Sequence, residues 1–324
     1  YVNLTGNINL RGKRVNVDTR INTELGKVHV LAAIDMLNKK YDGSLKLDNF
    51  DLGRFIQNPN IGKLSMAIQL EEGTEFDLEE LSGHLQTTVD SIYFNGFKYS
   101  NISLNGFFGN NGFLGHIAMN QPEIAFDLDT KIDFTRITDI VAYGHIHHSN
   151  LRALNLTQQN IKLSSQLDIE MTAFPIDSLN GYARINDLEL IRDDTVFYNM
   201  DVITFDARSW GDNFKDWRLI SDILSVDIDG QFNIENILGT TYEIIASRHP
   251  RVVRYLPEWE LKTDSIYNND FTMIIDVNDT EEFANLINPE LDTIRNLNLS
   301  LTYRNRGADY FEYYFQASAP KIQF

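Results

Sequence analysis

Strict alternation of apolar and polar residues is the dominant pattern along this chain. Between residues 124 and 134, apolar side chains alternate with the charged residues Asp127, Asp129 and Lys131. A period of two predicts antiparallel β-strands that have one apolar face and one solvated face. Some runs exceed the usual length of a globular strand, so we expect long strands. The residues expected on the apolar faces are Ile124, Phe126, Leu128, Ile132, Phe134, Leu163, Leu167, Ile169, Leu224, Val226, Ile228 and Phe232.

Turn dipeptides separate several of these runs. Asp42-Gly43, Asn95-Gly96, Asn105-Gly106 and Asn111-Gly112 are pairs that favour tight hairpin turns. Short connections between consecutive strands predict an all-β fold in which each strand pairs with its predecessor, an antiparallel β-meander.

A few short helices are expected between the strand blocks. Residues 51–58, 135–143, 241–249 and 279–288 each carry a short apolar stripe or stop just before Pro or Gly. A helix commonly ends at such a residue, because Pro disfavours the helical conformation of the residue before it. These helices are too few to cover the apolar face of a long sheet. The sheet must therefore either close on a second sheet as a sandwich or curl into a trough, and an apolar trough is suited to acyl chains.

The chain contains an internal repeat. The motif of residues 76–83 returns 98 residues later at 174–181, with Phe, Leu and Gly at matching places. Shared turn chemistry and shared alternation indicate one structural unit used twice. We expect residues 1–48 to end a preceding β unit, 49–173 and 174–278 to be two repeats, and 279–324 to start a third, all in one continuous array. Because the chain opens and stops within strand patterns, we expect it to be a segment of a longer protein.

Charge and composition then narrow the functional classes. The 324 residues carry 46 acidic against 28 basic side chains, a formal net charge of −18. Such a chain lacks the broad basic surface that nucleic acids require, so no nucleic-acid partner is expected. The absence of Cys excludes disulfides, thiol catalysis and Cys-ligated metals.

Residues that could carry chemistry form no convincing constellation. On a strand, His145 and His147 point the same way and could hold a metal, but no spacing supplies a third ligand, so surface histidines are the simpler interpretation. The many Asp residues lack the spacing of a calcium loop, and no carboxylate pair stands out for glycoside hydrolysis. Trp210 and Trp217 could form an aromatic platform for sugars, or could pack back on the sheet. We therefore expect no enzyme, no catalytic residue, no metal and no cofactor.

Four stretches, residues 45–53, 58–64, 76–83 and 92–102, resemble the interior of the very large TamB proteins of Bacteroidetes, members of the AsmA-like group of envelope proteins. The resemblance is best over about residues 40–160 and is a pattern, not a catalytic signature. It implies a long periplasmic β-sheet curled into a U-shaped groove. It also implies an inner-membrane anchor and a BamA-type outer-membrane barrel as partner, both through regions outside this segment.

The function implied by the resemblance is a periplasmic bridge whose groove conducts phospholipids between the inner and outer membranes, with their acyl chains as the ligand. The twelve apolar residues named above would line that groove. Two alternatives stay open. The chain could be a scaffold or chaperone that holds unfolded outer-membrane strands at a sheet edge. It could instead be a carbohydrate-binding or adhesin array of closed sandwiches.

Overall fold

The computed structural model describes residues 1–76, 80–109, 112–133, 138–174, 178–210, 214–233, 269–287, 295–305 and 311–318. Its described strands form one antiparallel sheet of 19 strands, accompanied by two short helices. The prediction of an open all-β meander is therefore confirmed. The strands are β1 (Val2–Arg11), β2 (Arg14–Thr23), β3 (Gly26–Asp35), β4 (Lys40–Asp51), β5 (Ile61–Thr74), β6 (Ser82–Phe94), β7 (Phe97–Tyr99), β8 (Ile102–Gly109), β9 (Gly112–Gln121), β10 (Ile124–Asp133), β11 (Thr138–Asn150), β12 (Ile161–Phe174), β13 (Asn180–Arg192), β14 (Val196–Trp210), β15 (Phe214–Ile220), β16 (Leu224–Gln231), β17 (Asp270–Asp279), β18 (Arg295–Asn305) and β19 (Phe311–Ser318).

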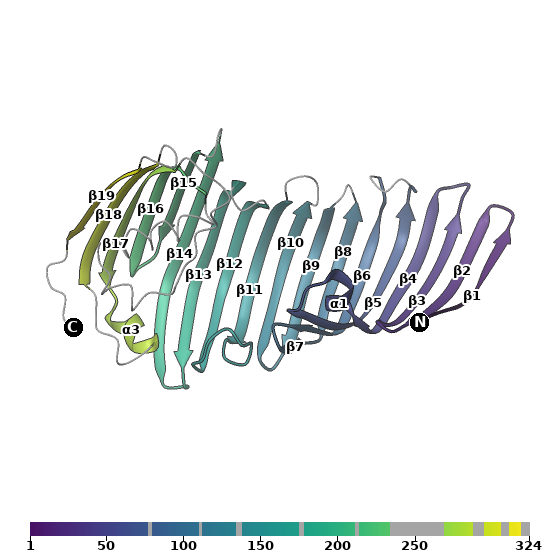
Figure 1. Cartoon of the computed structure of the whole chain (residues 1–324). Helices are drawn as coiled ribbons and strands as arrows, with labels where there is room; N and C mark the ends of the chain where they lie inside the picture. The colour runs from purple at the N-terminus through teal and green to yellow at the C-terminus, as the bar shows by residue number, and fades with distance from the viewer. Residues whose placement is uncertain are drawn as a thin grey trace. The chain divides into compact units, whose positions relative to one another are not determined.

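The contacts divide the chain into two compact units. The first unit comprises Tyr1–Asp168 and Asn186–Asn199, and the second comprises Ile169–Ile185 and Met200–Phe324. In the first unit, β1 to β6 pair in sequence order, β6 pairs with both β7 and β8, and β8 to β11 again pair in order (Figure 1). In the second unit, β14 to β19 pair in order. Both copies of the repeated motif lead into strands of 13 residues, β6 and β13. The repeat boundaries given above remain a prediction.

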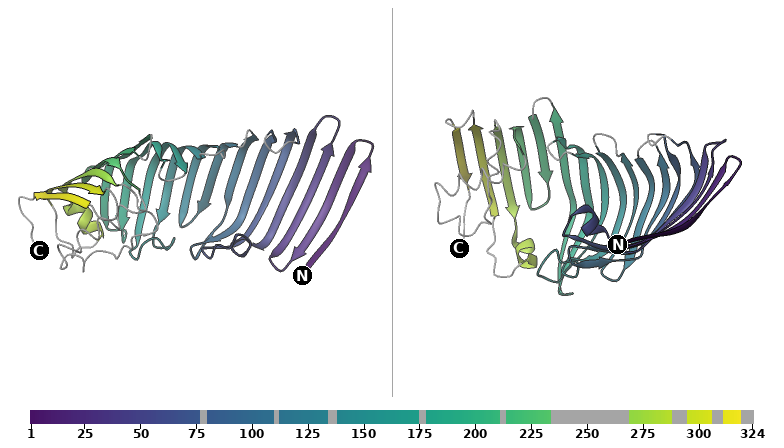
Figure 2. Two further views of the ribbon diagram at one scale, coloured as in Figure 1. Left: turned by 45° about the horizontal axis from the view of Figure 1, so that its top comes forward. Right: turned by 45° about the vertical axis from the view of Figure 1, so that its right-hand side comes forward.

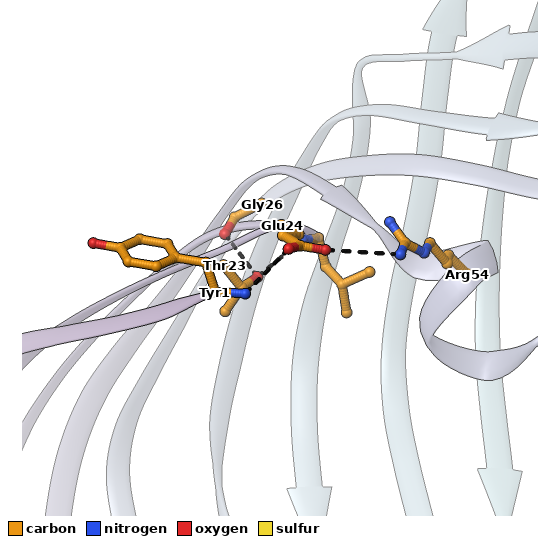
Figure 3. A network of polar contacts seen from close by, with 6 residues as sticks. Tyr1, Thr23, Glu24, Gly26 and Arg54 are labelled. Atoms are coloured by element: carbon orange, nitrogen blue, oxygen red, sulfur yellow. Dashed lines mark hydrogen bonds and ion pairs between the residues drawn. The ribbon is translucent and has the colours of Figure 1, made fainter.

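The first helix, α1 (Leu52–Ile56), forms where the sequence predicts it. The Asp51 side chain accepts a hydrogen bond from the Arg54 backbone N–H at 3.0 Å, which satisfies one of the free donors of the first turn. Gln57 ends the helix in the left-handed conformation, with φ of 58°. Figure 3 shows Arg54 reaching toward Glu24 in the turn between β2 and β3, with 3.9 Å between Arg54 Nη2 and Glu24 Oε2.

The other helix predictions have mixed outcomes. The helix α3 (Glu281–Ile287) confirms the one expected at 279–288. The helix expected at 135–143 is wrong, because β11 occupies this stretch from Thr138 onward. Ile140 faces Ile132 of β10 and Ala142 faces Thr130, so cross-strand pairing prevails over the helical stripe. The stretch 241–249 lies outside the described residues.

Two of the four predicted glycine turns are wrong. Asn95-Gly96 does form the turn between β6 and β7, and both residues have positive φ, of 49° and 77°. Gly43 and Gly106, in contrast, lie inside β4 and β8. Asn111 is outside the described residues.

Candidate functional site

The strand register of the first unit brings apolar residues of successive strands onto one face. Leu45 of β4 lies opposite Val30 of β3 and Ile68 of β5. Further along the sheet, Leu128 of β10 lies opposite Ile117 of β9. Because a strand places alternate side chains on opposite faces, these pairings extend a single apolar face across neighbouring strands.

The opposite face of the same unit is polar and carries His–Asp contacts between neighbouring strands. His29 Nε2 lies 2.8 Å from Asp18 Oδ1, and His116 Nδ1 lies 3.0 Å from Asp129 Oδ1. All four side chains are at least partly exposed to solvent. The aspartates predicted to alternate with apolar residues therefore belong to a solvated sheet face.

Glycines on the apolar face show that the sheet bends toward it. Gly106 of β8 lies opposite Gly115 of β9, and a Cβ added to Gly106 would lie 2.6 Å from the Gly115 Cα. A Cβ on Gly6 of β1 would lie 2.8 Å from the Thr19 Cα. The neighbouring backbone thus leans over the apolar face, which leaves no room for a side chain. Figure 2 shows the bent strands of this unit. The apolar face is therefore the inside of a trough.

The twelve residues predicted to line a groove fall into both units. The first unit holds Ile124, Phe126, Leu128 and Ile132 on the apolar face of β10, and Leu163 and Leu167 on β12. Gln166 of β12 donates to the Tyr143 hydroxyl on the polar face at 2.8 Å, which puts Leu163 and Leu167 on the apolar side. The second unit holds Ile169, Leu224, Val226, Ile228 and Phe232. Phe134 lies outside the described residues.

A cavity that these residues do not line lies on the apolar face over β3, β4 and β5. Its volume is about 380 Å³, and Phe76 and Leu81 from the connection between β5 and β6 help to line it. Burial raises the pKa of Tyr41 in its wall, and the Tyr41 hydroxyl donates to the Ser82 carbonyl at 3.1 Å. The alternating apolar residues of β3 and β4 are a sequence signal from which the strand side of the cavity could be predicted. Phe76 and Leu81 lie outside the alternating runs, so no periodic pattern predicts their contribution.

On the apolar face of the second unit, aromatic and aliphatic side chains pack into a buried cluster. The Trp217 ring meets Phe205 and Phe232 edge-on, with ring centres 5.7 and 5.5 Å apart. Lys215 is 1% exposed, and its ammonium donates to the Phe232 carbonyl and lies 5.0 Å from the centre of the Phe232 ring. The buried members of the cluster are Ala207, Trp217, Phe232, Phe271, Leu301 and Tyr303.

The two tryptophans do not form a shared platform. Trp210 lies opposite Phe214 and Trp217 opposite Ala207 in the same hairpin, so their side chains occupy opposite faces of the sheet. Trp210 is 51% exposed, whereas Trp217 is 7% exposed and belongs to the buried cluster. A sugar-binding site that uses both rings is therefore excluded.

The histidine cluster lies on the polar face of β11. The rings of His145 and His147 stack with centres 6.0 Å apart, and His147 pairs with Asp127 of β10. His148 Nε2 lies within hydrogen-bond distance of the Gln121 carbonyl oxygen, at 3.0 Å. Within the described ranges, no group of three or more His, Cys, Asp or Glu side chains is arranged to hold a metal ion.

Comparisons of the chain with protein-family models, curated proteins and solved structures find no match. Neither described helix is long and apolar enough to cross a membrane. The resemblance to TamB proteins therefore rests on the sequence stretches quoted above.

Proposed function

We propose that this chain is a non-catalytic segment of a periplasmic bridge whose apolar trough conducts phospholipids between the inner and outer membranes. The observation that carries the proposal is the continuous apolar face on the inside of the bent sheet of the first unit. Among the described residues, exposed carboxylates and histidines lie on the other face.

A trough of this kind suits transport because binding is spread over area. Each methylene group that leaves water gains about 0.8 kcal/mol, so an acyl chain is retained without any specific polar contact. Leu128 and Ile117 offer similar aliphatic contacts on adjacent strands, which lets a chain move from one strand to the next at little cost. The headgroup would stay in water at the open side of the trough.

Location and partners belong to the same proposal. A position in the periplasm, attachment to an inner-membrane anchor and contact with a BamA-type outer-membrane barrel rest on the resemblance to TamB proteins. Each would involve regions outside this segment. The acyl chains of phospholipids are the ligand that the described residues support directly.

Lipid retention tests the proposal. The chain purified from cells should carry phospholipid, detected by native mass spectrometry and by lipid extraction of the same sample. Leu128→Asp places a charge on the apolar face and should reduce the bound lipid about tenfold or more, because burying an unpaired carboxylate beside an acyl chain is unfavourable.

Leu114→Asp is the matched control. Leu114 lies on the neighbouring strand β9 but on the polar face, opposite Lys131, and is 60% exposed. This variant should retain lipid as the unchanged chain does. Lipid-free protein, or equal retention by both variants, would contradict the conduit and favour polypeptide binding at a sheet edge. Circular dichroism of both variants verifies that they fold.

A further inference from the structure

We propose that the cavity over β3, β4 and β5 is a discrete holding site for one long acyl chain, closed on one side by Phe76 and Leu81. This inference rests on the proposed function and adds one specific binding site to the trough. A lipid would pause there because Phe76 and Leu81 add contacts to those made by the strands beneath the acyl chain.

The chemistry of the cavity wall matches a saturated hydrocarbon. Val30, Ile34, Leu70, Phe76 and Leu81 line it, and its volume of about 380 Å³ falls within the range of small-molecule pockets. The space is too small for a helix or a strand of a partner protein. An acyl chain is the ligand that such a wall recognises.

The polar residues around the cavity are already engaged. The Asp42 carboxylate accepts a hydrogen bond from the Glu72 backbone N–H at 2.9 Å. The Tyr41 hydroxyl is held by the Ser82 carbonyl. Asp42 also lies opposite Ala33, so its side chain belongs to the polar face and not to the apolar side of the cavity. A hydrocarbon in the cavity therefore leaves neither the Asp42 carboxylate nor the Tyr41 hydroxyl unsatisfied.

Contacts on the β5 side of the connection hold Phe76 over the sheet. The Lys39 ammonium pairs with the Glu75 carboxylate, and the Glu75 N–H donates to the Lys39 carbonyl at 3.0 Å. The rings of Tyr41 and Phe76 lie 6.3 Å apart. Phe76 is thus fixed beside the cavity before any ligand arrives, so binding costs little ordering of the protein.

The second copy of the repeated motif gives an internal comparison. Leu179 takes the place of Leu81 in that copy, and in the second unit it packs against the buried cluster that contains Trp217 and Phe232. The motif therefore places a leucine over the apolar face in both units. Leu179 contacts the side chains of a buried cluster, whereas Leu81 lines a cavity, and this difference favours a ligand site in the first unit.

Filling the cavity is the first test. Ala32 lies on the apolar face and lines the cavity, whereas its neighbour Ala33 lies on the polar face. The probe is a long-chain fatty acid that carries a fluorescent polyene, titrated into the full chain. Ala32→Phe should weaken its tightest binding about tenfold, as expected when about two methylene groups remain in water. Ala33→Phe adds the same ring on the other face and should leave binding unchanged.

Truncating Leu81 is the second test, and it adds no large side chain to a strand. Leu81→Ala should speed dissociation of the probe severalfold, because the chain loses contact on one side. Leu179→Ala, at the matching place of the other repeat, should leave the dissociation rate unchanged. Thermal unfolding of each variant identifies any general loss of structure.

The outcomes separate this inference from the conduit itself. If Leu128→Asp reduces retained lipid while Ala32→Phe and Leu81→Ala bind and release the probe as the unchanged chain does, the holding site is wrong and the conduit stands. If no form of the chain binds the probe or lipid, both are wrong. If Ala32→Phe and Ala33→Phe weaken binding equally, the tightest site lies elsewhere and the inference is overturned.

Discussion

At the scale of single residues, glycines on the apolar face decide how far the sheet can bend. Gly106→Val should lower the free energy of unfolding by about 2 kcal/mol, because the new side chain would collide with the backbone of β9 at Gly115. Urea unfolding measures the change. Asn105→Val, one position away and exposed on the polar face, should stay within about 0.5 kcal/mol of the unchanged chain. An equally small change in both variants would mean that this bend is not imposed by close backbone contact.

Gly106 also explains why one of the turn predictions fails. A dipeptide such as Asn105-Gly106 favours a hairpin when only local chemistry is considered. In the fold, Gly106 instead allows two strands to approach inside a bend, a need that arises from the register with β9. Sequence alone does not reveal which strand will lie opposite, so the two uses of glycine look alike.

At the scale of elements, α1 is a short helix whose first turn depends on its cap. Asp51→Ala removes the acceptor for the Arg54 N–H and should lower the free energy of unfolding by about 1 kcal/mol. Asp51→Asn keeps an acceptor at the same position and should recover most of the loss. Urea unfolding compares the three proteins. If Asp51→Ala leaves stability unchanged, the contacts of α1 with the sheet, not its cap, hold the helix.

Most of the fold could be predicted at this scale, because alternation with a period of two is a property of each strand by itself. The strands around Leu128, Leu163 and Val226 appear where the pattern places them. The helix expected at 135–143 fails because its apolar residues also satisfy a strand pattern, and pairing with β10 decides between the two. A short apolar stretch can fit the helical period of about 3.6 residues and the strand period of two equally well.

The candidate site could be predicted only in part. The apolar face of β10 could be predicted from alternation, since the pattern lies within one strand and does not depend on its neighbours. The cavity could not be predicted, because Phe76 and Leu81 lie outside the alternating runs, and which strands they meet depends on the register of the whole hairpin. The separation of Trp210 from Trp217 was likewise hidden, since it follows from the positions of both residues in one hairpin.

At the scale of the whole molecule, a meander confines contacts to strands that follow one another in the sequence. β8 and β9 of the first unit pair with each other, and their outer partners are β6 and β10. Stability in such an array is approximately a sum over neighbouring strands, as in repeat proteins. A local defect should therefore stay local, and a trough could tolerate a weak strand without losing its other contacts.

Hydrogen exchange tests this view with the Gly106→Val variant. Backbone amides of β8 and β9 should exchange faster than in the unchanged chain, because the collision with Gly115 loosens this pair. Amides of β16 and β17, which pair within the second unit, should exchange at unchanged rates. Asn105→Val controls for the substitution itself. If exchange rises equally in β16 and β17, the sheet unfolds as one cooperative body, and stability cannot be assigned strand by strand.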